Sequence, residues 1–453
     1  MQNLIQKYNV PGPRYTSYPT VPYWNEKNFS KQQWLERLKH SFRQHNTQEG
    51  ISLYIHLPFC ESLCTFCGCN KRITKRHDVE QPYINALVKE WHLYLQHFDE
   101  KPLLKEIHLG GGTPTFFAPK HLQQLIKSIT DSCELAATYE FSFEGHPNNT
   151  SEEHLQVLYD VGFRRVSFGV QDYNPEVQKA IHRIQPFEHV KKVTEAARKI
   201  GYTSVGHDII FGLPFQTIDH IMYTIEKTKA LLPDRIAFYS YAHVPWIKGN
   251  GQRGFSEENL PTPAIKRQQY RLGKQELEAI GYQEIGMDHF ALKSDALYKA
   301  SQNDQLHRNF MGYTTTTSKI MIGLGVSSIS DSWTAFAQNV KKLEDYYTLL
   351  DNHEIPVYRG HLLTKEDQII RKHILNLMCK LYTQWTAKEE EIINFETIKA
   401  ALAEMQDDKL LTIHQNEVRV KENGRPFVRN VCMAFDVLLS RQQPQRQLFS
   451  MTV

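Results

Sequence analysis

The sequence lacks a long apolar run, a signal peptide and an excess of charge of one sign. No hydrophobic stretch approaches the roughly 18 residues that a membrane-spanning helix needs. The first residues, MQNLIQKYNVPGPRYTSYPT, have neither an apolar core nor a small-residue cleavage site. Lys plus Arg number 53 and Asp plus Glu number 50, so the net charge of +3 favours no polyanionic partner. We therefore expect a cytoplasmic protein that binds neither a membrane nor a nucleic acid.

Cysteine is also scarce, and its distribution is uneven. Four of the seven cysteines lie within ten residues of one another. The other three stand alone in apolar segments, where buried structural thiols are expected: Cys133, Cys379 and Cys432. In a reducing compartment a tight cluster of thiols indicates a metal site rather than a disulfide framework. The remaining composition, with 41% hydrophobic and 23% charged residues, excludes collagen-like, low-complexity and wholly disordered chains.

What is present is a repeated alternation of strand and helix in the first half of the chain. Short apolar strands are predicted at six places: residues 51–57, 105–110, 139–144, 165–170, 203–212 and 235–241. Helical patterns follow several of them: residues 80–98, 119–130 and 151–161. Because helices supply the crossovers that parallel strands need, the series predicts an α/β fold, either an open doubly wound sheet or a partial barrel. In both arrangements ligands collect at the carboxyl ends of the strands.

The 453 residues favour two or three domains. We expect an N-terminal arm with one helix, a catalytic region and a mainly helical lid: residues 1–46, 47–361 and 362–453. The last region predicts two helices, a hairpin and a further helix, as in a winged helix: residues 367–382, 394–406, 411–420 and 426–439. From residue 361 onward the chain has 13 Lys plus Arg against 12 Asp plus Glu, which favours packing over nucleic-acid binding.

The strongest chemical signal is the run CESLCTFCGC, which directly follows the first predicted strand. Cys60, Cys64 and Cys67 have the spacing C-x3-C-x2-C. Three thiolates on one short loop can hold three irons of a cubane cluster and leave the fourth iron open. The alternative is a tetrahedral zinc site that also uses Cys69. Structural zinc loops usually separate two C-x2-C pairs by a dozen or more residues, so this run fits zinc poorly.

The second signal is the run GGGTPT, residues 110–115, after the next predicted strand. Successive glycines let the backbone come within contact distance of a ligand, and strand-end amides can bind a carboxylate. A glycine-rich loop by itself is more often a tight turn. This loop follows the next strand after the one that precedes the cysteines. Because parallel strands share a direction, both loops are expected at the same end of the sheet.

Together the cysteine loop, with Phe66 before Cys67, and the GGGTPT loop resemble the radical S-adenosylmethionine (SAM) enzymes. Further segments resemble those members that oxidise the tetrapyrrole coproporphyrinogen III without oxygen: PGPRYTSYPT, YIHLPFC, CGCNK, GVQD, GLP, YAH, GMDHFA, LHRNFMGYTT, GLGVSSIS and RNVCMAFD. The resemblance implies a partial (β/α)6 barrel, a 4Fe-4S cluster and SAM as cofactors.

The resemblance also implies roles for individual residues. Cys60, Cys64 and Cys67 would bind the cluster, and Cys69 matches a fourth cysteine that is not a ligand in the family. Two SAM molecules are implied. The first would contact Tyr54, Gly111, Glu144 and Ile329. The second would contact Phe66, Gly112, Thr113, Gln171, Arg183, Asp208 and Ala242.

The implied reaction is the anaerobic oxidative decarboxylation of two propionates of coproporphyrinogen III to vinyl groups, giving protoporphyrinogen IX. A 5'-deoxyadenosyl radical from SAM would start it, with an unidentified electron donor and acceptor and a monomeric enzyme. Arg14 and Arg308 are candidates to bind the substrate carboxylates. The alternatives are a paralogue that binds or acts on haem or another tetrapyrrole, and a zinc-binding winged-helix regulator.

One segment departs from the family pattern. After Glu144 the family usually continues Val-Asp-Pro-Arg, whereas this chain has Gly145, His146, Pro147 and Asn148. The change exchanges an acid for an imidazole and removes a guanidinium next to the expected site. It therefore puts the substrate or the efficiency in question more than the radical chemistry.

Overall fold

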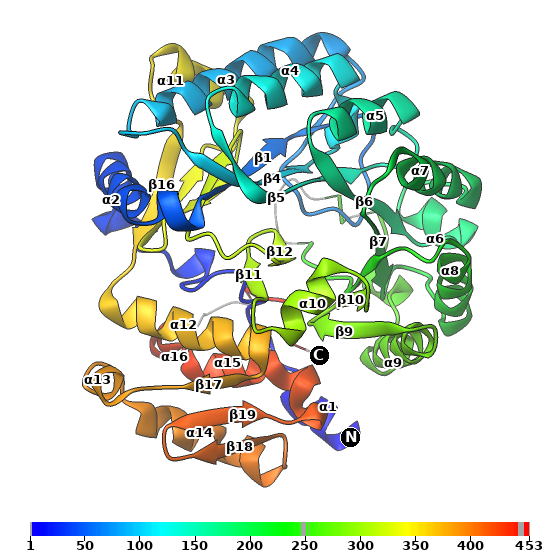
Figure 1. Cartoon of the computed structure of the whole chain (residues 1–453). Coiled ribbons are helices and arrows are strands. Elements are labelled where there is room, and N and C mark those ends of the chain that lie inside the picture. Colours follow the sequence, from blue (N-terminus) through cyan, green and yellow to red (C-terminus); the bar gives the residue numbers. More distant parts are fainter. Residues whose placement is uncertain (1, 246–250, 253, 443–447, 453) are drawn as a thin grey trace.

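Six parallel strands form the centre of a 12-stranded sheet, and they confirm the six predicted strands. The computed structural model describes residues 2–245, 251–252, 254–442 and 448–452. In it the strands lie side by side in sequence order (Figure 1): β1 Ile51–Leu57, β4 Leu103–Gly111, β5 Glu134–Gly145, β6 Phe163–Gln171, β7 Ser204–Phe211 and β8 Arg235–Ser240. Each pairs in parallel with the next. The partial barrel is the arrangement that forms.

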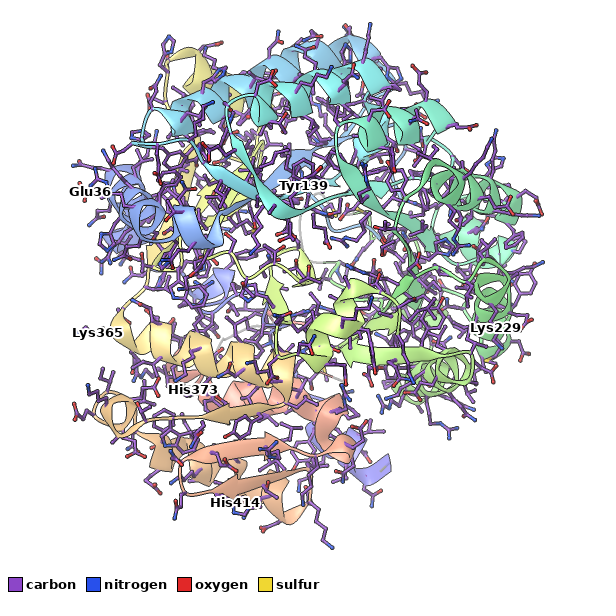
Figure 2. All side chains as sticks on the ribbon, in the orientation of Figure 1. Glu36, Tyr139, Lys229, Lys365, His373 and His414 are labelled. Atoms are coloured by element: carbon purple, nitrogen blue, oxygen red, sulfur yellow. The ribbon has the colours of Figure 1, made fainter. Side chains whose placement is uncertain are left out.

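Helices connect these strands and cover their outer side (Figure 1). They are α3 Glu80–Leu95, α4 Pro119–Thr130, α5 Glu152–Asp160, α6 Pro175–Ala180, α7 Phe187–Ile200 and α8 Ile218–Leu231. Helix α5 has an N-cap, because the Ser151 side chain accepts a hydrogen bond from His154 N at its start. Figure 2 places Glu36 and Lys229 at opposite sides of the molecule, on helices α2 (Lys31–Glu49) and α8. In the described ranges no helix is long and apolar enough to cross a membrane.

Alternate residues of the parallel strands meet different surroundings, as the pleat of a strand requires. One set is apolar and packs in the main core, for example Leu53, Ile107 and Phe141. The other set includes charged side chains that pair across the sheet. Near the amino ends of the strands, Glu140 lies 3.0 Å from Arg165. Nearer the carboxyl ends the same set includes Glu144 and Asp208.

The sheet continues beyond the six predicted strands on both sides. Next to β1 come β13 Ile320–Leu324, β14 Ile329–Asp331, β15 Ala335–Asn339 and β16 Val357–Leu362; next to β8 come β10 His289–Leu292 and β9 Tyr282–Gly286. Smaller elements complete this part: β2 Phe59–Cys60, β3 Arg72–Ile73, β11 His307–Asn309, β12 Gly312–Thr314, α9 Pro263–Ala279, α10 Ala296–Gln302 and α11 Leu343–Asp351. None of these strands was predicted, because most are too short for a two-residue alternation to be recognised in the sequence.

The C-terminal region has the predicted order of helices and hairpin. Its elements are α12 Lys365–Lys380, β17 Tyr382–Gln384, α13 Ala387–Glu390, α14 Phe395–Asp407, β18 Leu411–His414, β19 Glu417–Val420, α15 Val428–Phe435 and α16 Val437–Arg441. Strand β17 adds a third strand beside the hairpin, which turns at Gln415 and Asn416. The prediction of one helix over 426–439 is wrong. The chain leaves helical geometry at Asp436, whose side chain accepts from Leu439 N and caps α16.

The N-terminal arm was predicted with one helix, which is wrong, because α1 Gln2–Tyr8 precedes α2; the part of the arm before α2 packs against the C-terminal region. Tyr8, Tyr15 and Tyr18 are buried in its apolar cluster, and the Tyr15 hydroxyl donates to Asp436 Oδ2 at 3.1 Å. The division at residues 47 and 362 stays a prediction, and its end residues 1 and 453 lie outside the described residues. These contacts join the N-terminal part of the chain to its C-terminal region.

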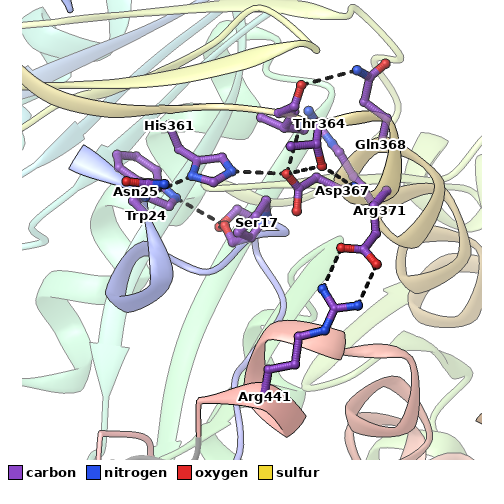
Figure 3. Close-up of polar contacts among 12 residues, drawn as sticks. Ser17, Trp24, Asn25, His361, Thr364, Asp367, Gln368, Arg371 and Arg441 are labelled. Atoms are coloured by element: carbon purple, nitrogen blue, oxygen red, sulfur yellow. Dashed lines mark hydrogen bonds and ion pairs between the residues drawn. The ribbon is translucent and has the colours of Figure 1, made fainter. Parts of the chain in front are cut away.

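Figure 3 shows the polar contacts where the arm, β16 and α12 meet. Asn25 N donates to His361 Nδ1 at 2.9 Å, which leaves the proton on Nε2, 3.3 Å from Asp367 Oδ2. Burial alone would raise the pKa of Asp367, but hydrogen bonds from His361 and Thr364 lower it. The C-terminal region is thereby joined to the sheet by a charged, hydrogen-bonded contact.

Candidate active site

A cavity of about 410 Å³ lies at the carboxyl ends of the parallel strands. Twelve of the predicted site residues line it: Cys60, Cys64, Phe66, Cys67, Gly111, Gly112, Thr113, Glu144, Gln171, Arg183, Asp208 and Ala242. They come from the loop after β1, from the ends of β4 to β8 and, for Arg183, from the loop after α6, so residues as far apart as Cys60 and Ala242 converge as the parallel topology requires.

The cysteine loop is tied down at both sides by polar residues that the sequence did not single out. Thr65 Oγ1 donates to Ala180 O at 2.9 Å. Gln252 Nε2 donates to Phe66 O at 2.9 Å and to Ala242 O at 3.0 Å, which joins the loop to the end of β8. Gln252 lies 186 residues from Phe66 along the chain, so no local pattern could have indicated this contact.

The three predicted thiols have donors beside them. Thr113 Oγ1 lies 3.3 Å from Cys60 Sγ, and Arg183 Nη1 lies 3.9 Å from Cys64 Sγ. Burial raises the pKa of Cys60 to about 11. A hydrogen bond from the Cys69 thiol lowers the pKa of Cys67. Cys69 thus acts on Cys67 in this arrangement.

The thiol set fits an iron–sulfur cluster. Three soft donors on one loop face one cavity, and a cubane takes one thiolate for each iron. Within the ranges that the structure describes, no three His, Cys, Asp or Glu side chains are grouped to hold a metal ion. The three predicted ligands line one cavity at the carboxyl ends of the strands.

The glycine-rich loop has the conformation that only glycine adopts readily. Gly111 has φ +114°, and a Cβ there would lie 2.7 Å from the His56 ring. Its N–H points toward Glu144 Oε2 at 3.4 Å. Gly112 N donates to Leu57 O at 2.8 Å, so the loop stays against the end of β1. The backbone therefore borders the cavity with no side chain between it and a ligand.

Gln171 and Arg183 leave polar atoms without partners at the end of β6. Gln171 has φ +67°, a strained value for a residue other than glycine. A Cβ on Gly169 would lie within 2.8 Å of both side chains, so glycine is needed for them to pass. Gln171 Oε1 and Arg183 Nε are buried and have no hydrogen-bond partner in the described part of the chain. Such atoms indicate a polar ligand.

Two carboxylates complete the polar lining. Burial raises the pKa of Asp208 to about 6, although Ser167 Oγ donates to it at 2.8 Å. Burial acts the same way on Glu144, but His108 and the N–H of Gly111 outweigh it and lower the pKa of that carboxyl. Glu144 is therefore ionised at neutral pH, while Asp208 titrates closer to neutrality.

Two residues of the departing segment, Gly145 and His146, line the cavity. His146 lines the cavity, and Asn148 N donates to its Nδ1 at 3.1 Å, which places the ring proton on Nε2. Burial and the nearby Arg183 lower the pKa of His146 to about 2, so the ring is neutral. Asn148 instead donates to Ile184 O at 2.9 Å. The chain thus presents an uncharged imidazole near the thiols.

Four predicted site residues lie outside this cavity. Tyr54 stands behind it on β1, with its hydroxyl 3.0 Å from His56 Nδ1. Ile329 begins β14, which is separated from β1 by β13. Arg14 lines a second cavity and pairs with Asp288. Arg308 on β11 is 4% exposed and donates to Arg14 O at 3.3 Å.

Known proteins resemble the chain along nearly its whole length. Residues 54–228 match the family model described as the Radical SAM superfamily. An oxygen-independent coproporphyrinogen III oxidase of Helicobacter pylori is 40% identical over 444 residues, which cover 96% of each chain. That of Escherichia coli is 37% identical over 461 residues, covering 99% of this chain and 98% of its own.

A solved structure agrees with these similarities. The coproporphyrinogen III oxidase of Escherichia coli, described as a radical SAM enzyme, superposes with a TM-score of 0.89 at 35% identity. The match covers 96% of this chain and 98% of the other. The likeness therefore includes the arm and the C-terminal region as well as the partial barrel.

Proposed function

Since this chain belongs to the oxygen-independent coproporphyrinogen III oxidase family, within the radical SAM superfamily, we propose that it converts coproporphyrinogen III to protoporphyrinogen IX. The enzyme is an oxidoreductase of porphyrin and haem biosynthesis. The observation that carries the proposal is the convergence of twelve predicted site residues on one cavity in a chain similar to these enzymes from end to end.

The 4Fe-4S cluster and SAM, when bound, supply a carbon radical that takes a hydrogen atom from a propionate β-carbon, after which loss of CO2 and one electron leaves a vinyl group. Cys60, Cys64 and Cys67 are the proposed cluster ligands. Around them the protein excludes water and holds the reactants in place.

Two SAM molecules per chain are part of the proposal. The first is assigned to Tyr54, Gly111, Glu144 and Ile329. The second is assigned to Phe66, Gly112, Thr113, Gln171, Arg183, Asp208 and Ala242. The unpartnered atoms of Gln171 and Arg183 support the second set, because a carboxylate or an amine of a ligand would satisfy them. Ionised Glu144 would accept from ammonium or hydroxyl donors.

The remaining partners are proposed more broadly. The substrate is a tetrapyrrole, the enzyme acts as a cytoplasmic monomer, and the electron donor and acceptor are unidentified. Residues 362–453 act as a lid, held by the arm contacts described above. Arg14 and Arg308 are proposed to bind substrate carboxylates. Arg14 lines the second cavity, and Arg308 lies behind it and donates to Arg14 O.

An anaerobic assay with coproporphyrinogen III, SAM and a reductant tests the proposed function. We expect protoporphyrinogen IX, methionine and 5'-deoxyadenosine as products. A protein that cleaves SAM but leaves coproporphyrinogen III unchanged would instead be a paralogue for another tetrapyrrole. A colourless protein with a single zinc would support the regulator.

A further inference from the structure

A second cavity, of about 230 Å³, adjoins the candidate active site. The two share Ser240, Tyr241 and Ala242 at the carboxyl end of β8. The other walls of the second cavity come from the arm, α9, the turn between β9 and β10, and the C-terminal region. A molecule that occupies the first cavity can therefore extend toward the second along a common wall.

Positive side chains outnumber negative ones on the walls of this second cavity. The cations are Arg14, Lys266, Arg267, Arg425 and Arg429, and the anions are Glu284 and Asp288. Both anions already have partners. Asp288 pairs with Arg14, and Glu284 pairs with Lys274 outside the cavity. The remaining cations are therefore not neutralised by the cavity's own carboxylates.

Lys266 and Arg267 form no ion pair with any residue that the structure describes, and both have unused donors. Lys266 Nζ makes one hydrogen bond, to Tyr241 O at 2.7 Å, although an ammonium has three donors. Arg267 makes no hydrogen bond or ion pair with any residue the structure describes, and its guanidinium lies 5.4 Å from the Tyr270 ring centroid. Both stand near the start of α9, where the helix dipole disfavours a cation that lacks an anion.

A buried guanidinium behind the cavity adds to the positive charge. Arg308 is 4% exposed, and its Nε and Nη1 have no hydrogen-bond partner among the described residues. Burial, Arg14 and Arg429 lower the pKa of Lys266 to about 8, against the opposing effect of Asp288. An anion bound in the cavity would stabilise the charged form of Lys266.

We propose that the second cavity binds substrate carboxylates that are not reacting, with Lys266 and Arg267 as its specificity-determining residues. The inference rests on the proposed function, in which one propionate of a tetra-anionic substrate reacts while three must be held elsewhere. Arg267 can grip a carboxylate with two parallel hydrogen bonds, whereas Lys266 acts as a point charge. The shared wall at Tyr241 places both close to the reacting site.

The test uses holoenzyme reconstituted without oxygen and three substitutions on α9. Arg267→Met and Lys266→Met remove the two cations, and Arg271→Met is the matched control, since Arg271 is exposed on the same helix and does not line the cavity. Turnover of coproporphyrinogen III gives kcat and KM. Fluorescence titration gives the Kd of coproporphyrin III, which carries the same four carboxylates, and of its tetramethyl ester.

We expect Arg267→Met and Lys266→Met each to raise KM and the coproporphyrin Kd about tenfold, with kcat within about twofold of wild type. Lys266→Arg should retain most of the affinity, Arg271→Met should match wild type, and the ester should bind wild type and both Met variants equally. Unchanged Kd values for coproporphyrin in both Met variants would overturn the inference.

The two proposals fail in different ways. A wild-type enzyme that cleaves SAM but does not convert coproporphyrinogen III would contradict the proposed function. The porphyrin titration then still decides the cavity: weaker coproporphyrin binding in the Met variants supports it, and equal binding overturns it. A cluster absorbance spectrum for each variant separates a lost contact from a misfolded protein.

Discussion

The inner side of the parallel strands carries charged groups at both ends, and the two ends differ in whether those charges are paired. Near the amino ends, Glu140 lies 3.0 Å from Arg165, and Arg235 lies 2.7 Å from Asp295. Near the carboxyl ends, Arg183 and Asp208 border an open cavity. One set of charges is compensated within the protein, and the other retains capacity for a ligand.

The difference shows in the pKa shifts at the two ends. Burial alone would raise the pKa of Glu140, but Arg165 and Arg235 lower it. At the other end burial prevails and raises the pKa of Asp208 to about 6. Charges that stabilise a fold are paired internally, whereas a functional site keeps perturbed groups. Substitutions at the two ends test this division.

Replacing single cysteines should separate ligands from neighbours. Cys60→Ser, Cys64→Ser or Cys67→Ser should each abolish the cluster and all SAM cleavage, because each removes the only thiolate on one iron. Cys69→Ser should keep the full iron content. Iron analysis and anaerobic absorbance spectra measure both. Complete iron loss in Cys69→Ser would mean that four thiolates hold the metal.

Removing one arginine from each end should produce opposite defects. Arg235→Met should lower the free energy of unfolding by about 3 to 5 kcal/mol, because it leaves Asp295 buried without a compensating charge and leaves Glu140 with Arg165 alone. Arg183→Ala should leave stability nearly unchanged and weaken the second SAM site about tenfold. Anaerobic denaturation and SAM titration are the measurements. Equal losses of stability would remove the distinction between the two ends.

Gln171→Ala is the companion of Arg183→Ala at the same site. It should also weaken the second SAM site with the cluster intact, because both residues follow a different strand from the cysteine loop. Two SAM per chain with unchanged affinities in both variants would exclude these residues from the site.

The titration of Asp208 predicts the pH dependence of stability without ligands. Because its folded pKa of about 6 lies above the unfolded value of 3.8, the folded state binds more protons between these limits. The free energy of unfolding should therefore fall by about 2 to 3 kcal/mol as pH rises from 4 to 7. Asp208→Asn should abolish this contribution. The measurement is the free energy of unfolding of both proteins, from denaturation curves at several pH values between 4 and 7. The same pH dependence in wild type and Asp208→Asn would contradict the prediction.

The smallest effect is expected at the departing segment. The double variant His146→Asp with Asn148→Arg restores the family pattern and should change turnover of coproporphyrinogen III by less than about threefold, since His146 is neutral and Asn148 lies outside the cavity. Turnover that rises about tenfold or more, about 1.4 kcal/mol in the transition state, would mean that the native enzyme is adapted to a different tetrapyrrole.

Local patterns in the sequence predicted much of the architecture and most of the cavity lining. The apolar strands at 51–57 and 165–170 were found because their central positions are buried. The cysteine loop and Gly111 could be placed at one end of the sheet because parallel strands share a direction. The resemblance added Gln171 and Arg183, which have no distinctive local signal.

Local patterns failed where a partner lies far along the chain. Strand β13 pairs with β1 across more than 260 residues, and its five residues alone do not indicate a neighbour. The helix break at Asp436 depends on a capping hydrogen bond and on the buried Tyr15 of the arm. Helical periodicity continued through that position and predicted an unbroken helix.

The strand–helix series, the thiol loop and the glycine loop follow from local sequence, because hydrophobic periodicity and backbone freedom are properties of neighbouring residues. Which charges are paired and which remain available depends on the packing of distant segments. Glu140 and Glu144 are four residues apart on one strand, yet the first lies between arginines and the second faces a cavity. Their surroundings come from other strands, and electrostatic energy depends on distance and burial in space rather than on position along the chain.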